Sequence, residues 1–452
     1  MAVSIGTGTA RRSTLFSARW VLAQFLSFEA VFVLFLYSNE IKVLLPPLPA
    51  DETVIFAAIS MGIGAWIISR EGLYLPGLVI ACTAFLFVGF ALVSWGWTPS
   101  RILFKQRIAY LLVFNMWCVI GGGMIIASSR ARMLRFLCMM LVLALVVAAD
   151  GMRIYIQYGN FRTLDMWDEL GFTRTYLNWG YTVADGAAIA VVIGLYSRFL
   201  SLKQLALFGC FLLCATFLMV GGARGPLLGI GLAGLVVIAV RLPRIGPDRF
   251  EVSVGQIAGI TIGIMAVGMI VVMIASGRAT TTINRFVQLA DQAEGERGSA
   301  QGASRWLYWP AAARFFLESP IIGYGFASFS YVYHSGSERQ GGHPHNVVLE
   351  TAAELGTIGL ILFFLFVWSG LRHASLRRLR EDPLMVCILA YFLTAIQNSM
   401  FAKELAGGRK LFLAVALFAV PAASHALRAA RSGTRPPIAH GAGSPRPFPT
   451  DP

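Results

Sequence analysis

A histidine pair directly before a long apolar run offers an acid–base group. The order is His343-Pro344-His345-Asn346, and the apolar run continues to about residue 370. Because proline is tolerated only at the start of a helix, His345 and Asn346 are predicted in the first turn of a membrane helix. The positive helix end keeps the imidazole neutral near pH 7, so His345 could accept a proton. A capping or surface histidine is the alternative.

The same apolar run contains a polar stripe. Asn346, Glu350 and Glu354 recur at every fourth position, so they share one face of the predicted helix. Two carboxylates within a membrane segment must face the interior of the helix bundle and find partners there. Arg224, at the mouth of an earlier helix hairpin, is the predicted counter-ion. A purely structural buried ion pair is the alternative.

The segment before the histidines is long and polar enough to bind a ligand. Residues 304–318, which include Arg305 and Trp309, predict an amphipathic helix with Pro310 near its first turn. Gly323 and Gly325 permit close approach of the backbone to a ligand, although a plain turn also explains them. The whole segment 277–345 is predicted to form short helices over one face of a bundle.

Metal and nucleotide chemistry are not indicated. His334, His343 and His345 lie near Glu338, but zinc-motif spacing is absent and Pro344 is expected to point its two neighbouring rings apart. No phosphate-binding loop that ends in Gly-Lys-Ser/Thr is found. All six cysteines fall inside apolar runs, which argues against disulfides and a thiolate site. We expect no cofactor and no metal.

Composition indicates that these residues are positioned by a membrane-embedded helix bundle. Of 452 residues, 57% are hydrophobic and 13% charged, against roughly 25% charged in soluble domains. The net charge of +14 is scattered over short connectors, which favours membrane lipids over nucleic acid as partners. Of the basic residues 32 are Arg and 5 are Lys, which suits phosphate recognition or simply reflects a GC-rich genome.

About twelve transmembrane helices follow from the rule that a span needs roughly 20 apolar residues. The predicted spans are 18–38, 53–69, 73–95, 108–128, 134–150, 179–197, 204–222, 225–240, 252–276, 346–370, 384–401 and 411–427. The predicted fold is thus an all-α polytopic membrane protein with a large extracytoplasmic loop. Its parts are a cytoplasmic N-terminus (1–17), nine spans (18–276), a periplasmic loop (277–345), three spans (346–427) and a disordered cytoplasmic tail (428–452).

Basic clusters near residues 11–19, 130–135, 241–249 and 372–380 occupy alternate connectors, which places them in the cytoplasm. The opposite connectors contain arginines as well, including Arg101, Arg107 and Arg224. Such extracytoplasmic arginines, which resist the positive-inside rule, are candidates for function.

Four motifs, taken in order, resemble the O-antigen ligase and polymerase superfamily over roughly residues 215–370. They are Gly222-Ala223-Arg224-Gly225-Pro226, Arg305-x-x-x-Trp309, Glu318-Ser319-Pro320-x-x-Gly323-x-Gly325, and His343-Pro344-His345-Asn346 followed by Glu354-Leu355-Gly356.

The resemblance implies a metal-independent glycosyltransferase in a bacterial inner membrane, multi-pass, with its active site facing the periplasm. It would move a glycan from undecaprenyl diphosphate to a sugar of the lipid A core. By position, Arg224, Arg305 and His345 correspond to the family's essential residues. Predicted substrate-binding residues are Arg224, Arg305, Asn346, Glu354, Gly323 and Gly325.

Two alternatives to an O-antigen ligase stay open. An O-antigen or exopolysaccharide polymerase would use the same donor chemistry with a second lipid-linked repeat as acceptor. A transporter of lipid-linked glycan would use the arginines and the acidic stripe as a translocation path. Transporter sites usually lie near the membrane midplane on broken helices, whereas the motifs here gather at one predicted face.

Overall fold

The protein is described here from a computed structural model. The structure describes residues 26–45, 49–158, 176–197, 201–221, 224–240, 244–245, 250–251, 300–339 and 342–423. The predicted N-terminus, the predicted span 252–276, the first part of the large loop and the tail 428–452 lie outside these residues.

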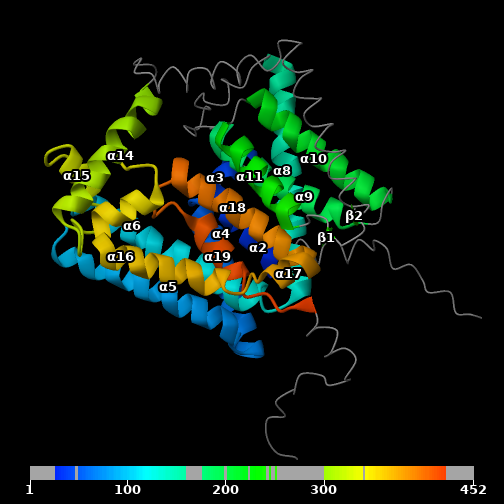
Figure 1. The fold of residues 1–452 in the computed structure, drawn as a ribbon, viewed down its shortest axis with the longest axis horizontal. Coiled ribbons are helices and arrows are strands. Elements are labelled where there is room, and N and C mark those ends of the chain that lie inside the picture. Colours follow the sequence, from blue (N-terminus) through cyan, green and yellow to red (C-terminus); the bar gives the residue numbers. More distant parts are fainter. Residues whose placement is uncertain are drawn as a thin grey trace, which may run out of the picture. The chain divides into compact units, whose positions relative to one another are not determined.

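Helices dominate the described residues (Figure 1). Their bounds are α2 (Phe28–Leu36), α3 (Ser38–Ile41), α4 (Glu52–Glu71), α5 (Leu75–Val93), α6 (Ile102–Tyr110), α7 (Met116–Ile120), α8 (Arg130–Tyr158), α9 (Tyr176–Leu195), α10 (Leu202–Gly221), α11 (Arg224–Val240), α14 (Ala300–Glu318), α15 (Phe329–Tyr333), α16 (Val347–Leu371), α17 (Leu376–Glu381), α18 (Pro383–Phe401) and α19 (Arg409–Leu417). Short turns of other helical types are η1 (Lys42–Leu44), η2 (Ser94–Gly96), η3 (Leu111–Asn115) and η4 (Gly121–Ile126). One antiparallel pair joins β1 (Arg244–Ile245) to β2 (Phe250–Glu251).

Within the described part of the chain, 7 helical segments are long and apolar enough to cross a membrane. They are Glu52–Glu71, Leu75–Gly96, Ile102–Ile126, Arg130–Gln157, Leu202–Gly221, Val347–Leu371 and Pro383–Phe401. Large apolar side chains such as Leu86, Phe364 and Trp368 are exposed on them, as expected for surfaces that face lipid. The chain is therefore a multi-pass membrane protein, and the total of about twelve spans stays a prediction.

The predicted span 108–128 begins earlier and is not a uniform helix. It runs from Ile102 through α6 and α7, with π-helical turns at η3 and η4. Three consecutive glycines in η4 allow its backbone to pack directly against the backbone of α5. A Cβ added to Gly77 of α5 would lie only 2.1 Å from the Gly123 carbonyl oxygen. π-helical turns of this kind are frequent at functional sites.

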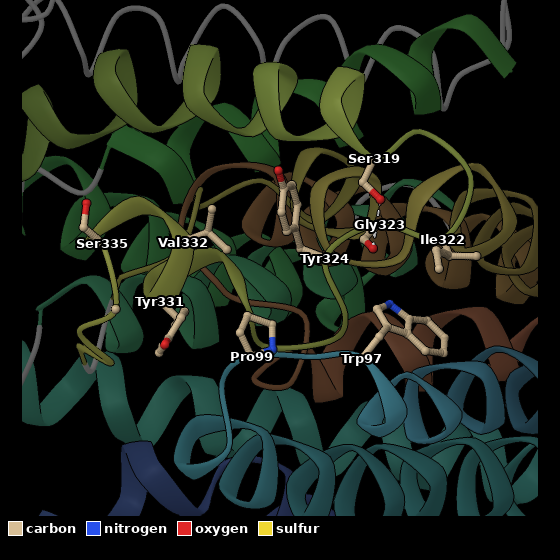
Figure 2. A pocket seen from close by; sticks show the side chains of 10 residues that line it. Trp97, Pro99, Ser319, Ile322, Gly323, Tyr324, Tyr331, Val332 and Ser335 are labelled. Atoms are coloured by element: carbon tan, nitrogen blue, oxygen red, sulfur yellow. Dashed lines mark hydrogen bonds between the residues drawn. The ribbon is translucent and has the colours of Figure 1, made fainter.

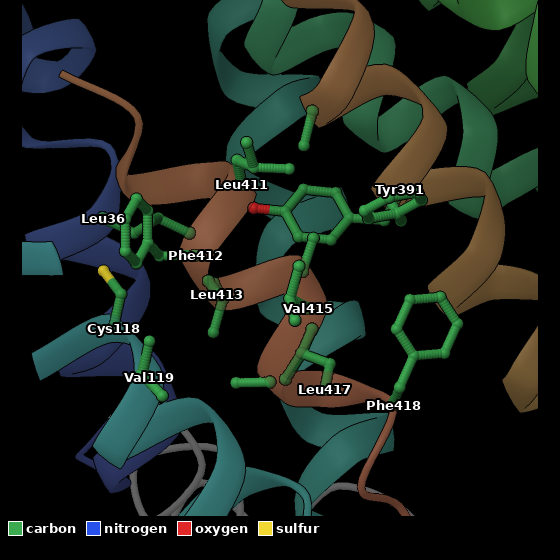
Figure 3. Close-up of a cluster of buried hydrophobic side chains, with 14 of the residues drawn as sticks. Leu36, Cys118, Val119, Tyr391, Leu411, Phe412, Leu413, Val415, Leu417 and Phe418 are labelled. Atoms are coloured by element: carbon green, nitrogen blue, oxygen red, sulfur yellow. The ribbon is translucent and has the colours of Figure 1, made fainter. Parts of the chain in front are cut away.

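The core of the bundle surrounds α19, whose residues from Leu411 to Leu417 are all buried (Figure 3). This helix packs against α5, α7, α16 and α18. The predicted span 411–427 is wrong in extent, because α19 ends at Leu417 and residues 418–422 are not helical. Pro421 explains the stop, since proline cannot continue a helix. Nine residues are also too few to cross a membrane alone.

A break at Gly356 divides α16, which the sequence predicts as one uninterrupted helix. Gly356 has φ 62° and ψ −161°. The loop after α14 fills the break: the Tyr324 and Gly325 amides donate to the Ala353 and Glu354 carbonyls at 3.1 and 2.7 Å. On the other side, the Thr357 and Ile358 amides donate to the Pro320 and Ile321 carbonyls. The loop thus satisfies the backbone groups that the broken helix leaves free.

Candidate active site

His345 lies just before α16 rather than in its first turn. Asn346 is the N-cap residue, and its side-chain oxygen accepts hydrogen bonds from the Val348 and Leu349 amides at 3.1 Å. His345 itself has φ 55°, in the left-handed region. The predicted position in the first turn is therefore wrong, because the Asn346 cap begins the helix one residue later. A histidine in this region of φ costs on the order of 1–3 kcal/mol, and such outliers cluster at functional sites.

The rings of His343 and His345 are in contact, with centroids 4.0 Å apart and planes inclined by 54°. The expectation that Pro344 points the two rings apart is wrong. The left-handed backbone of His345 places its ring on the same side as the ring of His343. The Nδ1 atom of His345 lies 3.4 Å from the Ala402 carbonyl oxygen. Since a carbonyl only accepts, a hydrogen bond here requires the proton on Nδ1, which is the tautomer in which Nε2 has a lone pair for a proton.

Trp309 connects α14 to the histidine segment. Its indole nitrogen donates to the Pro344 carbonyl at 2.9 Å, and its ring lies 6.2 Å from that of Phe401. Arg305 precedes Trp309 by one helical turn, and its side chain lies outside the described residues. Pro310 is in the middle of α14, not near its first turn, because the helix already begins at Ala300. Two predicted motifs, separate in sequence, thus meet at this point.

Arg224 is the first residue of α11, and its side chain also lies outside the described residues. The adjacent Gly225 packs closely, because a Cβ there would be 2.4 Å from the Tyr181 hydroxyl and 3.6 Å from the Gln397 amide nitrogen. Gln397 lies one turn before Phe401 on α18, and Ala402 follows directly. The start of α11 therefore packs against α18, and the end of α18 contacts Trp309 and His345.

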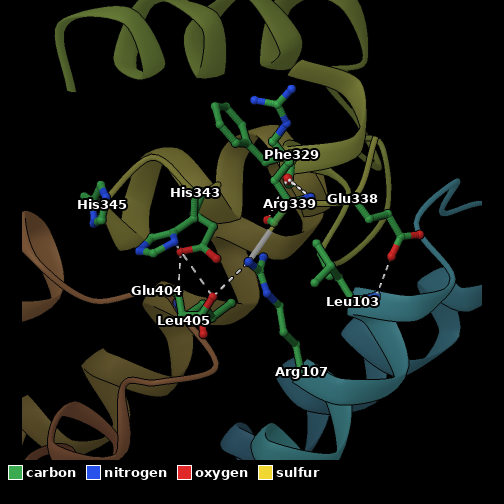
Figure 4. Close-up of polar contacts among 12 residues, drawn as sticks. Leu103, Arg107, Phe329, Glu338, Arg339, His343, His345, Glu404 and Leu405 are labelled. Carbon is green, nitrogen blue, oxygen red and sulfur yellow. Dashed lines mark hydrogen bonds and ion pairs between the residues drawn. The ribbon is translucent and has the colours of Figure 1, made fainter. Parts of the chain in front are cut away.

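A buried charge cluster lies behind the histidines (Figure 4). Arg107 of α6 is 5% exposed, and its Nη2 atom lies 3.0 Å from the Glu404 Oε2 atom. Glu350 and Glu354 are near enough to interact electrostatically with Arg107. Among the described residues the counter-ion of the acidic stripe is thus Arg107. The side chain of Arg224 lies outside the described residues, so its pairing with the stripe stays a prediction.

Backbone amides complete the surroundings of both carboxylates. Glu350 Oε2 accepts from the Leu405 amide at 2.9 Å, whereas its Oε1 atom is buried without a hydrogen bond. Glu354 accepts from the Ala327 and Phe329 amides at 2.8 and 3.1 Å. Ala327 has φ 63°. Glu354 therefore holds a strained loop in place, and its contact with substrate stays a prediction.

Gly323 and Gly325 lie in that loop. A Cβ on Gly323 would lie 2.4 Å from the Glu354 carbonyl oxygen, and one on Gly325 would lie 2.5 Å from the Thr98 Cβ. Both have positive φ, 67° and 94°. Close backbone packing thus accounts for both glycines, and substrate binding by them stays a prediction.

Gly323 also lines an open groove of about 710 Å³ beside the loop (Figure 2). Trp97, Tyr324 and Tyr331 supply its aromatic surface. The Tyr324 hydroxyl donates to Glu318 Oε2 at 2.8 Å, and this bond raises the pKa of Tyr324. The groove lies on the surface of the same loop that α16 holds.

No cluster of three or more metal-ligating side chains is present among the described residues. Glu338, close to the histidines in sequence, instead caps α6 by accepting from the Arg101, Ile102 and Leu103 amides at 2.8, 3.2 and 2.7 Å. The His334 ring packs edge-on against Tyr333. The absence of a metal stays a prediction.

Sequence reasoning missed Glu404 and Ala402, which lie in the connector between α18 and α19. Arg107 was only one of several extracytoplasmic arginines. The available signal was a Lys403-Glu404 pair in a short connector that ends in Gly407-Gly408. Burial lowers the pKa of Lys403, while nearby Glu40 favours its charged form.

Comparison with known proteins supports the resemblance found in the motifs. Residues 209–364 match the sequence model of a family described as O-antigen ligase. A protein of Rickettsia conorii named "Putative polysaccharide ligase" is 26% identical over 232 residues, 49% of this chain and 51% of that protein. Proteins of the same description in Rickettsia felis and Rickettsia typhi are 28% identical over 176 residues and 24% identical over 301 residues. These matches cover 36% and 60% of this chain, and 39% and 69% of the relatives.

This chain thus spans about half the length of the first of these relatives. The matched region begins within α10 and ends within α16, so it includes Arg224, Arg305, the loop held by Glu354 and both histidines. The four motifs and these matches agree that residues 209–364 of this chain are similar to the O-antigen ligase family.

Proposed function

We propose that this protein is an O-antigen ligase of a bacterial inner membrane. It transfers a glycan from undecaprenyl diphosphate to a sugar of the lipid A core, at a site that faces the periplasm. The observation that supports this most is the meeting of His345, the Trp309 end of the Arg305 motif and the α18 end beside Arg224 within the family-matched region.

The remaining architecture of the proposal follows the predicted topology. About twelve spans form the bundle, and residues 277–345 form a loop over its periplasmic face. In this topology the basic clusters are cytoplasmic. The end of α5 near residue 97 and the starts of α11 and α16 at residues 224 and 347 would then all face the periplasm.

The reaction is an inverting displacement. The acceptor hydroxyl oxygen forms a bond to the anomeric carbon of the donor sugar, and the bond from that carbon to the diphosphate oxygen breaks. His345 Nε2 takes the hydroxyl proton, which is worth about 10²- to 10⁴-fold in rate. The diphosphate leaves with its electron pair, and Arg224 and Arg305 stabilise the new charge by charge-assisted hydrogen bonds.

The test uses purified full-length protein with lipid-linked glycan and lipid A core, without nucleotide and with chelator. We expect polymer joined to the core. Elongation of lipid-linked repeats instead would identify a polymerase, and no product with any acceptor would exclude both enzymes. A deletion strain separates the same outcomes, since loss of a ligase leaves bare core and loss of a polymerase leaves core with a single repeat.

A further inference from the structure

The connector between α18 and α19 contacts the histidine site from behind. Within four residues, the Ala402 carbonyl approaches His345 Nδ1 at 3.4 Å, and the Leu405 amide donates to Glu350. Between them, Glu404 Oε2 lies 3.9 Å from His343 Nδ1. One short segment therefore touches both histidines and the acidic side chain of α16.

Glu404 is held in this position by Arg107. The guanidinium Nη2 atom lies 3.0 Å from the same carboxylate oxygen that faces His343. Arg107 comes from α6, which Glu338 caps from the segment just before His343. The Arg107 side chain is buried, whereas that of Glu404 is 30% exposed. Loss of Glu404 would leave the buried guanidinium without this partner, which favours the observed arrangement.

His343 lies between this carboxylate and the active-site ring. It is 8% exposed, and its ring contacts that of His345 at 4.0 Å. The distance to Glu404 is too long for a direct hydrogen bond and within the range of an ion pair. The order of contacts is Arg107, Glu404, His343, His345.

We propose that Arg107, Glu404 and His343 are positioning residues for His345. They hold its ring against the Ala402 carbonyl, so that the proton stays on Nδ1 and Nε2 faces the acceptor hydroxyl. When Nε2 takes the hydroxyl proton, the charge of Glu404 stabilises the imidazolium across the His343 ring. The proposal rests on the proposed function, because it takes His345 as the general base.

The charges around the pair define a pH signature. Glu404 faces the pair from the connector, and the charged groups that interact with Glu404 are Arg107 on α6, Glu350 and Glu354 on α16, and the neighbouring Lys403. Loss of the negative Glu404 disfavours the imidazolium and lowers the pKa of His345, whereas loss of Arg107 raises it. The rising limb of kcat/KM against pH should therefore move to lower pH in Glu404→Gln and to higher pH in Arg107→Gln.

The experiment compares purified wild type with Glu404→Gln, Arg107→Gln and His343→Phe in the transfer assay with lipid-linked glycan and lipid A core. His343→Phe keeps a ring beside His345 but removes the nitrogen that faces Glu404. We expect Glu404→Gln and His343→Phe to lower kcat about 10- to 100-fold, with KM within about 3-fold, as for a misplaced catalytic group. Glu381→Gln, whose carboxylate is 64% exposed beside Arg377, is the matched control and should be unchanged.

His345→Ala is measured in parallel to separate the two proposals. If it is inactive while Glu404→Gln and His343→Phe retain wild-type kcat and pH limb, positioning is wrong and the proposed function stands. If His345→Ala is active, the general-base assignment fails and the positioning proposal fails with it. Melting and size-exclusion profiles report folding, and if Glu404→Gln does not fold, His343→Phe decides the outcome.

Discussion

The carboxylates at the two ends of the bundle are paired with basic residues in different ways. At the end where α8 and α18 begin, Arg130 donates to both oxygens of Asp382 at 2.6 and 2.7 Å. Asp382 also caps α18 by accepting from the Leu384 amide, and Arg135 lies 3.0 Å from Glu29. Each carboxylate there has a cationic partner, which suits a region whose task is to fix helix ends.

At the other end, the carboxylates of Glu350, Glu354 and Glu404 all interact with the single Arg107. Glu350 Oε1, the Gln397 amide and Asn398 Oδ1 are buried without hydrogen bonds in the described structure. Each such group costs on the order of 1–3 kcal/mol. At the first end the Arg135 and Arg378 Nε atoms likewise have no hydrogen bond in the described structure. The two ends therefore differ in how their carboxylates are paired and in the left-handed backbone of His345.

The largest expected effect follows from His345→Ala at the second end. Transfer should fall by about 10²- to 10⁴-fold because the acceptor loses its base. The melting temperature should stay close to that of wild type, since the side chain is only partly buried and α16 keeps its Asn346 cap. Near-normal transfer by this variant would contradict the assignment.

Arg224→Ala and Arg305→Ala should each lower transfer on the order of 100-fold, because each removes a preorganised donor for the leaving diphosphate. Arg314→Ala on the same helix as Arg305 is the control. Its side chain is 67% exposed and 3.5 Å from Glu318, so its loss should leave the rate unchanged. Equal losses for Arg305 and Arg314 would point to α14 stability rather than chemistry.

Gly356→Ala tests the loop that fills the break in α16. A Cβ would lie 2.4 Å from the Ile321 carbonyl, at φ 62°, so we expect a loss of about 3 kcal/mol in unfolding free energy and loss of transfer. Gly89→Ala in α5 has no atom within 4 Å of the added Cβ. Its effect should stay within about 1 kcal/mol of wild type, and similar effects for both glycines would refute the close-packing argument.

Asp382→Ala sharpens the comparison from the other end. It removes the helix cap and leaves Arg130 without its partner, which should cost about 2–4 kcal/mol of stability. Transfer per folded molecule should be unchanged, because the site lies at the opposite helix ends. Denaturation in detergent and single-turnover rates separate the two quantities, and a large loss of rate at full folding would show that the ends are coupled.

Sequence reasoning located the helices well because membrane spans are set by apolar length alone. The segments predicted for α4, α5, α10 and α18 differ from the structure by only one to two residues at most ends. His345 and the Arg305-x-x-x-Trp309 motif were found because their residue types are costly and distinctive near a membrane.

Hydrogen bonds between backbone segments far apart in the chain could not be predicted from the sequence in the same way. The break at Gly356 depends on a loop some 35 residues earlier that offers amides and carbonyls in register, and no periodicity in 346–370 shows it. Arg107 and Glu404 lie about 300 residues apart in sequence. Their pairing follows from how α6 packs in the bundle. Side chains that are far apart in the sequence therefore form one charge cluster in the structure.

The smallest expected effect concerns an exposed pair near the first end. Arg377 lies 3.1 Å from Glu381 across one turn of α17, with side chains 84% and 64% exposed. Solvent screens such pairs, so Arg377→Ala should change stability by no more than about 0.5 kcal/mol and leave transfer unchanged. Thermal melts of Arg377→Ala and Asp382→Ala side by side then test burial directly. If the two losses were equal, pairing alone would decide stability at this end. The contrast with the three carboxylates that interact with the single Arg107 near His345 would then lose its basis.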